Sequence, residues 1–226
     1  GLLIAEFGEE RRDFIAISDT PQQMINAILA IEDRRFFEHP GIDFIGIARA
    51  ALKNITGKSH EGASTITMQV ARNFFLTSEK TLKRKTNEIL LAIKIERTLS
   101  KEEILELYIN QIYLGQRSFG FAAAANTYYG KNLDQLNLGE TALLAGLPKA
   151  PSRYNPLVRP HLAIKRQQNV LNSMLRHGYI DKPTYILALE DPLSLKEKFM
   201  KSELQANYVA EMVRKTLFDE FGDKIY

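Results

Sequence analysis

The stretch Ile31-Glu32-Asp33-Arg34-Arg35-Phe36-Phe37-Glu38-His39-Pro40-Gly41 organises the chain, because a strong helix signal runs directly into it. Thr20 is predicted to be the N-cap of this helix, with Pro21 at its first position and Gln23 completing a capping box. The apolar residues that follow recur at helical spacing and predict one buried stripe: Met24, Ala27, Ile28 and Ile31.

Glu32 stands beside this stripe at the predicted C-terminal end of the helix. The negative end of the helix dipole and partial burial both disfavour an ionised carboxylate, so we expect the pKa of Glu32 to be raised. Such a carboxylate suits a general base that works near neutral pH. A Glu-Asp pair at a helix end is more often a solvated terminus, so the rest of the chain must decide between the two interpretations.

Composition limits the classes of protein to which the chain can belong. Its 226 residues suffice for a substantial core in one large or two small domains, and the absence of cysteine excludes disulfides and thiol catalysis. The net charge of +3 fits an anionic substrate or a membrane face but does not indicate nucleic acid. No apolar run is long enough to predict a membrane-spanning helix. Because the sequence opens at Gly1 in apolar residues, we expect a fragment that lacks its upstream segment.

Beyond the opening residues the pattern predicts an almost wholly helical chain. Two short apolar runs, residues 2–7 and 14–17, are expected to pair as a β-hairpin. Later helices are bounded by capping residues and by glycine or proline stops. The predicted caps are Asp43, Ser64, Ser100 with Glu103, and Asn137 with Glu140, and the predicted stops are Gly57, Gly115, Gly130, Pro148 and Gly178.

Residues 62–69 combine a flexible backbone, hydroxyl groups and the start of a helix. The free N–H groups of a helix start bind phosphate well, and Gln69 and Arg72 would share a face with Thr65. Ordinary capping explains the same residues, so this stretch alone leaves the two alternatives even.

Two cations, Arg84 and Lys85, precede Glu88 by about one helical turn. A surface ion pair of this kind is worth only about 0.3–0.5 kcal/mol and has no function of its own. This charged group, Glu32 and a helix start suited to phosphate all fall between residues 32 and 88 of the sequence, which favours one shared site. His39 could orient Glu32, although a structural hydrogen bond is the commoner role, and no histidine has metal-ligand spacing.

Taken together, these stretches resemble the glycosyltransferase domain of class A penicillin-binding proteins. The opening stretch with Phe7-Gly8-Glu9-Glu10-Arg11-Arg12 looks most like the 1A type from Gram-negative bacteria. Five ordered signatures and their flanks carry the resemblance over about residues 20–180. They are Glu32-Asp33-x-x-Phe36-x-x-His39-x-Gly41; Gly62 to Gln69; Arg84-Lys85-x-x-Glu88; Lys101 to Asn110; and Gly120 with Ala123-Ala124, followed by Tyr128 to Lys131 and Ala145 to Pro151.

The resemblance implies a mainly α fold, with a lysozyme-like helical lobe, a smaller membrane-associated jaw lobe and a short N-terminal β-hairpin. It divides the chain into residues 1–19, leading from a missing membrane anchor; residues 20–190, the glycosyltransferase domain; and residues 191–226, a linker toward an absent transpeptidase domain. The Ser-x-x-Lys and Lys-Thr-Gly signatures of that second domain do not occur here.

The implied reaction is the polymerisation of lipid II into β-1,4-linked glycan strands, with inversion and release of undecaprenyl pyrophosphate. It would take place on the periplasmic face of the bacterial inner membrane and would be a target of moenomycin-type inhibitors. No cofactor is required, although Mg or Mn could accompany the pyrophosphate.

By match to the family, each candidate residue has an expected role. Glu32 is the general base, and Glu88 is a second catalytic residue that orders the basic side chains or a divalent ion. Asp33, Phe36 and His39 bind the acceptor or shape the site. The expected pyrophosphate ligands are Ser64, Thr65, Gln69, Arg72, Lys80, Arg84 and Lys85.

Two rival functions stay open. A lysozyme-like hydrolase or lytic transglycosylase also uses an acidic residue at a helix end, but it leaves the basic residues idle. A silent docking module would need none of these side chains.

Overall fold

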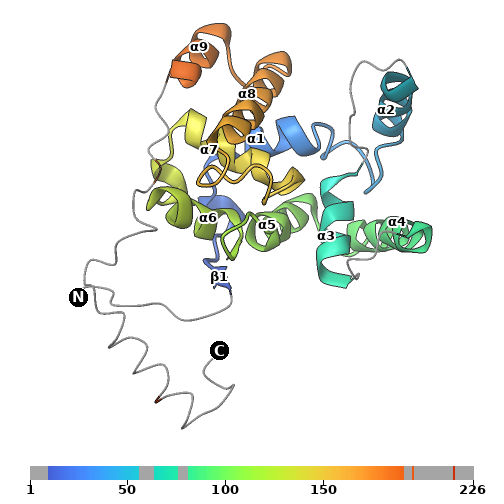
Figure 1. The fold of residues 1–226 in the computed structure, drawn as a ribbon. Helices are drawn as coiled ribbons and strands as arrows, with labels where there is room; N and C mark the ends of the chain where they lie inside the picture. Colours follow the sequence, from blue (N-terminus) through green and yellow to red (C-terminus); the bar gives the residue numbers. More distant parts are fainter. Residues whose placement is uncertain (1–9, 56–63, 76–80, 191–194, 196–215, 217–226) are drawn as a thin grey trace.

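The computed structural model describes residues 10–55, 64–75, 81–190, 195 and 216. This part of the chain is helical, as predicted, with one pair of two-residue strands (Figure 1). Its helices are α1 (Gln22–Glu32), α2 (Phe44–Ile55), α3 (Ile66–Phe75), α4 (Leu82–Glu96), α5 (Lys101–Gln111), α6 (Phe121–Tyr129), α7 (Leu138–Gly146), α8 (Pro160–Arg176) and α9 (Lys182–Glu190). Short 3₁₀ turns occur at Ile17–Asp19, Leu133–Gln135 and Leu147–Lys149.

Helix α7 forms the centre of the helical body and packs against α1 and α8. Every residue from Gly139 to Gly146 is buried, which is the pattern of a helix that other helices surround. The predicted capping box of Asn137 and Glu140 starts it, and Lys131 donates to both carboxylate oxygens of Glu140 at 2.7 and 2.9 Å. This fixed core carries α1, and therefore Glu32, as a rigid element.

Helix α3 packs between α4 and α5 on the other side of the body (Figure 1). The predicted capping box of Ser100 and Glu103 starts α5, and Gly130 ends α6 in the left-handed conformation. Glu32 of α1 accepts a hydrogen bond from Gln69 of α3, and Lys85 of α4 donates to Ser64 just before α3, so this helix connects the two halves of the candidate site.

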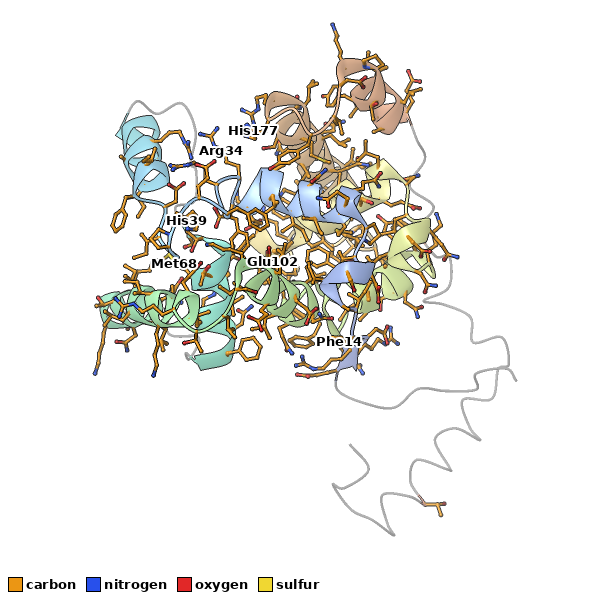
Figure 2. The ribbon with its side chains drawn as sticks, turned by 180° about the vertical axis from the view of Figure 1, so that it is seen from behind. Phe14, Arg34, His39, Met68, Glu102 and His177 are labelled. Carbon is orange, nitrogen blue, oxygen red and sulfur yellow. The ribbon has the colours of Figure 1, made fainter. Side chains whose placement is uncertain are left out.

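Helix α2 stands apart from the helical body (Figure 1). As predicted, Asp43 caps it, with the Gly46 N–H donating to Asp43 Oδ1 at 2.9 Å. Its first turn exposes Phe44, Ile45 and Ile47 to solvent. Within the described ranges, no helix has the length and apolar character needed to cross a bilayer. The side chains of the whole body, seen from behind in Figure 2, show α2 at the edge opposite α8 and α9.

Several local predictions were wrong. The strand Arg11–Arg12 (β1) pairs in parallel with Ser118–Phe119 (β2), and residues 14–17 form no strand; residues 2–7 lie outside the described residues. The N-cap of α1 is Pro21, because the Thr20 hydroxyl donates instead to the Ala16 carbonyl at 3.0 Å.

At α3 the capping residue is Thr65 and not Ser64, since Thr65 Oγ1 accepts from the Met68 N–H at 3.2 Å. Helix α9 follows residue 181. The predicted linker at residues 191–226 lies outside the described residues except for Leu195 and Thr216.

Candidate active site

Glu32, the last residue of α1, has a largely buried carboxylate whose side chain is 12% exposed. Gln69 Nε2 of α3 donates to Glu32 Oε2 at 2.8 Å, and Arg166 Nη2 of α8 lies 3.5 Å from Oε1. Burial raises the pKa of Glu32 above its ordinary value, while the Gln69 hydrogen bond and then the charges of Arg166, Lys149 and Arg72 oppose that rise. Glu32 is therefore not a solvated helix end, and its protonation is tuned by its surroundings.

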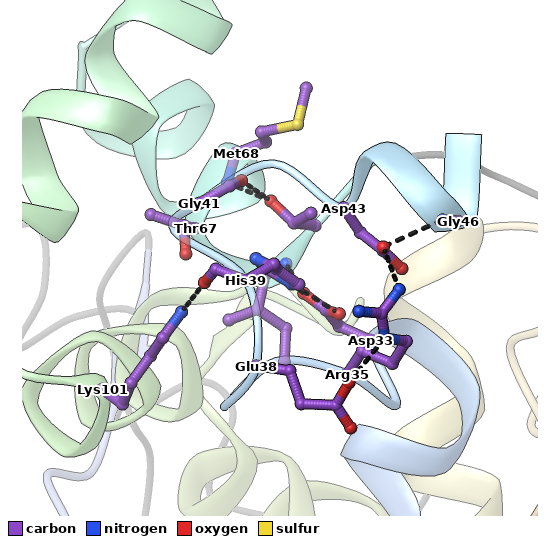
Figure 3. A network of polar contacts seen from close by, with 12 residues as sticks. Asp33, Arg35, Glu38, His39, Gly41, Asp43, Gly46, Thr67, Met68 and Lys101 are labelled. Atoms are coloured by element: carbon purple, nitrogen blue, oxygen red, sulfur yellow. Dashed lines mark hydrogen bonds and ion pairs between the residues drawn. The ribbon is translucent and has the colours of Figure 1, made fainter. Parts of the chain in front are cut away.

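Asp33 fixes the position of α3 relative to Glu32. His39 Nε2 lies 2.9 Å from Asp33 Oδ1 and 3.0 Å from Asp33 Oδ2 (Figure 3). The Ile66 N–H donates to Asp33 Oδ2 at 3.0 Å. Ile66 is the first residue of α3, so a negative charge sits where the helix dipole is positive. Asp33 and His39 are both buried, and their hydrogen bonds hold the loop after α1 against the start of α3.

Lys101, the first residue of α5, supports the loop that follows Asp33. Its Nζ donates to the His39 carbonyl and to Glu96 Oε1, both at 2.7 Å, and lies 4.5 Å from the centre of the Phe36 ring (Figure 3). Phe36 is fully buried, so its ring braces the loop from inside the protein. Thr65 is also buried, and its hydroxyl donates to the Gly41 carbonyl at 2.6 Å.

The first turns of α4 carry the basic cluster. Lys85 Nζ donates to Ser64 Oγ at 2.9 Å and to Glu88 Oε1 at 3.1 Å, while Arg84 Nη1 lies 3.5 Å from Glu88 Oε2. The Glu88 side chain is 1% exposed, whereas that of Lys85 is 39% exposed. The buried Glu88 carboxylate thus orients both cations. The basic cluster of Arg84, Lys85 and Glu88 keeps one net positive charge toward solvent.

Helix α3 brings the basic cluster and Glu32 into one region. Ser64 lies two residues before the first residue of this helix, and Gln69 lies in its first turn. The predicted residues Glu32, Gln69, Ser64, Lys85 and Glu88 are therefore linked by hydrogen bonds through α3. The predicted ligand Lys80 lies outside the described residues, as does Gly62, the first residue of the second signature.

Three residues that surround Glu32 have no role expected from the sequence. The charges of Arg166 and Lys149 lower the pKa of Glu32. Burial raises the pKa of the Tyr108 hydroxyl, and the charge of Glu32 raises it further. The Tyr108 hydroxyl has no hydrogen-bond partner among the described residues. Arg166 had a recognisable signal, because it interrupts the buried stripe of α8 between Ala163 and Val170.

The described residues contain no group of three acidic or histidine side chains that could hold a metal ion. What they offer is a buried carboxylate at the end of α1 and, near the start of α3, a cluster of α4 that keeps one positive charge toward solvent. A base can take the proton of an acceptor hydroxyl, and nearby cations can stabilise a phosphate-type leaving group. A site with both can transfer a group from that leaving group to the hydroxyl.

Comparison with known proteins agrees with this geometry. The model of the family described as Transglycosylase matches residues 1–175. The chain is 52% identical over 227 residues to penicillin-binding protein 1A of Neisseria gonorrhoeae, covering all of this chain and 28% of that protein. It is 52% identical over 225 residues to penicillin-binding protein 1A of Haemophilus influenzae, covering 99% of this chain and 26% of that one.

A crystal structure of the Haemophilus influenzae protein superimposes with a TM-score of 0.61 and 34% identity in the structural match, covering 99% of this chain and 24% of that one. The chain thus spans about a quarter of the length of these curated relatives. With a family model over most of its residues and half of its sequence shared with these proteins, the chain belongs to the transglycosylase family.

Proposed function

We propose that this chain is a peptidoglycan glycosyltransferase that polymerises lipid II into β-1,4-linked glycan. The observation that carries the proposal is that α3 contacts both groups. Gln69 of α3 donates a hydrogen bond to Glu32, and Lys85 donates one to Ser64, just before the start of α3. A hydrolase needs a base but has no use for a cation cluster on the adjoining turn. Family membership supports the same choice.

In the proposed reaction, Glu32 takes the proton from the 4-hydroxyl of an incoming lipid II. The oxygen attacks the anomeric carbon of the growing strand, and the bond from that carbon to the pyrophosphate breaks. One displacement inverts the anomeric centre. The leaving group departs with its negative charges, which Lys85 and Arg84 stabilise, while Glu88 keeps both cations oriented.

Several further features belong to the proposal. A divalent cation such as Mg²⁺ would be bound mainly by the pyrophosphate oxygens, with few protein ligands. The exposed apolar residues Phe44, Ile45 and Ile47 support contact of α2 with the surface of the inner membrane, where a lipid-linked substrate resides. The length of the relatives supports a transpeptidase domain in the same full-length chain. Moenomycin-type inhibitors are expected to compete for the pyrophosphate region.

Incubation with lipid II and gel analysis of the glycan products tests the function. We expect the parent protein to build long strands and Glu32→Gln to build none while keeping its helical circular dichroism. Glu102→Gln, an exposed acid on α5 (Figure 2), is the matched control and should polymerise like the parent. Shortening of added strands would instead indicate a hydrolase, and undiminished polymerisation by Glu32→Gln would refute the assignment.

A further inference from the structure

The Ser173 hydroxyl of α8 donates a hydrogen bond to the main-chain carbonyl of Ala30 in α1, at 2.6 Å. The two residues are 143 positions apart in the sequence, and both are buried. Ala30 stands two residues before Glu32, in the last turn of α1. The bond therefore joins α8 to α1 within the same helical turn as the proposed base.

The Ala30 carbonyl needs a partner from outside its own helix. The last four carbonyl groups of an α-helix have no helical N–H ahead of them. The Asp33 N–H still donates to the Leu29 carbonyl at 3.1 Å, but the backbone of Asp33 is no longer helical. No main-chain N–H of the described residues is bonded to the Ala30 carbonyl. Because an unpaired buried carbonyl is costly, Ser173 supplies a bond that this helix end requires.

Helix α8 holds the end of α1 at two points (Figure 1). Arg166 Nη2 lies 3.5 Å from Glu32 Oε1, and Ser173 follows seven residues later on α8. Seven residues make about two helical turns, which puts both side chains on one face of the helix. One contact reaches the carboxylate and the other reaches the main chain two residues before it. A single contact would leave the end of α1 free to pivot, whereas two contacts fix the direction of the carboxylate.

The same bond acts on the charge around Glu32. Free carbonyl groups make the C-terminal end of a helix negative, which disfavours an ionised carboxylate nearby. The Ser173 hydroxyl proton offsets part of this negative potential at the Ala30 carbonyl. Without it we expect the pKa of Glu32 to rise further above its ordinary value. The other charged or titratable groups that face the carboxylate would stay in place: Arg166 of α8, Lys149, Arg72 of α3, Tyr108 of α5 and Asp33.

We propose that Ser173 is a positioning residue for the catalytic base, which it serves by holding the last turn of α1 against α8. This inference rests on the proposed function, because that function makes Glu32 the base. Ser173 acts through the placement of the Glu32 carboxylate between Gln69 and Arg166. A base must lie within hydrogen-bond reach of the proton that it removes, so displacing it by part of an ångström slows the chemical step. Binding of lipid II at the basic cluster is unaffected.

Steady-state polymerisation of lipid II by protein carrying Ser173→Ala tests the kinetic effect. We expect kcat at neutral pH to fall about tenfold, with KM for lipid II within about twofold of the parent value. Raising the pH should recover part of the loss, because more of the enzyme then carries an ionised Glu32. Ser173→Cys keeps a weak donor of similar size and should lie between the parent and Ser173→Ala. It replaces Ser173→Ala if that variant loses its helical circular dichroism.

Gln167→Met is the matched control. Gln167 is 5% exposed and Ser173 is 4% exposed on the same helix, and Gln167 Nε2 donates to the Gly139 carbonyl of α7 at 3.0 Å. The variant therefore also removes a buried hydrogen bond from α8 to a main-chain carbonyl, and its unfolding midpoint should fall as that of Ser173→Ala does. Its kcat and pH profile should match those of the parent, since the lost bond does not reach α1.

A second measurement needs no lipid II. Titration of the glutamate carboxyl carbons by ¹³C NMR, with the Glu32 signal assigned by its absence in Glu32→Gln, reports the pKa of Glu32 directly. Ser173→Ala should raise this pKa and Gln167→Met should leave it unchanged. A parent-like kcat and pKa in Ser173→Ala would overturn the inference, and so would changes in both that Gln167→Met reproduces. A raised Glu32 pKa in Ser173→Ala, together with a parent protein that does not polymerise lipid II, would retain the positioning of this carboxylate and refute the proposed function.

Discussion

Replacing Arg166 with glutamine is expected to slow polymerisation at neutral pH and to move the acid limb of the pH profile upward. Arg166 Nη2 lies 3.5 Å from Glu32 Oε1, and the two side chains are only 8% and 12% exposed. Burial already raises the pKa of Glu32, and the Arg166 charge partly offsets that rise. Without this charge Glu32 keeps its proton to higher pH, so less of the enzyme carries an ionised base.

The size of the effect follows from the separation of the charges. Two unit charges 3.5 Å apart attract by about 5 kcal/mol at an effective dielectric constant of 20 and by about 1 kcal/mol in water. Because Lys149 and Arg72 continue to act on Glu32, we take a loss between these limits, about 1.4–2.8 kcal/mol. At a pH below the acid limb this corresponds to a rate about ten to a hundred times lower.

The measurement is kcat/KM for lipid II polymerisation at a series of pH values, with the thermal unfolding midpoint recorded for each variant. Raising the pH should restore much of the activity of Arg166→Gln, and Arg166→Lys should lie between it and the parent. Lys165→Gln removes an exposed cation from the neighbouring position of α8 and should behave like the parent.

Two outcomes would refute this reasoning. A pH profile of Arg166→Gln that superimposes on that of the parent would show that the arginine does not act on the base. A uniform loss at every pH, accompanied by a lower unfolding midpoint, would reduce Arg166 to a packing role through its 2.9 Å hydrogen bond to the Gly146 carbonyl.

Three further predictions concern the basic cluster and the helical scaffold. Lys85→Met should raise KM for lipid II at least about tenfold with the fold intact, since it removes a charge-assisted contact; a salt-independent KM equal to that of the parent would contradict it. Gly120→Ala should lower the free energy of unfolding by about 1–3 kcal/mol in urea titrations, because φ is +87° and the new Cβ would lie 2.8 Å from the Asn110 carbonyl oxygen; unchanged stability would rule out strain. Glu140→Ala should cost about 2 kcal/mol by loss of the capping box and of the Lys131 contacts, measured in the same way, and Glu190→Ala is its exposed control.

Signals contained within a few residues of the chain were read correctly. The capping boxes that begin with Ser100 and Asn137 need only residues three positions apart, and the Gly130 stop needs only a residue that tolerates positive φ. Glu32 was placed at the end of its helix by the same kind of local pattern. These features depend on hydrogen bonds that the segment makes with itself, so the sequence suffices to predict them.

Local signals failed where a hydrogen bond other than the expected cap engaged the side chain. Thr20 is a good capping residue, but its hydroxyl bonds to Ala16 in the preceding turn. Ser64 was predicted to cap α3, but Lys85 of α4 binds its hydroxyl and Thr65 takes over the cap. The Thr20 bond is a local alternative to the cap, and capping preferences do not decide between the two. The Ser64 bond depends on the packing of α4 against α3, which residue preferences do not measure.

The clearest example is the environment of Glu32. Its position at a helix end is a local property, but its raised pKa depends on how completely α3 and α8 exclude water and on where they place Gln69 and Arg166. An arginine inside an apolar stripe shows that a buried anion must exist somewhere in the protein, because an unpaired buried cation is too costly. It does not show which carboxylate is the partner. Pairing such interrupted stripes with acidic residues at helix ends gives a short set of candidate bases, and in this chain that pairing leads from Arg166 to Glu32.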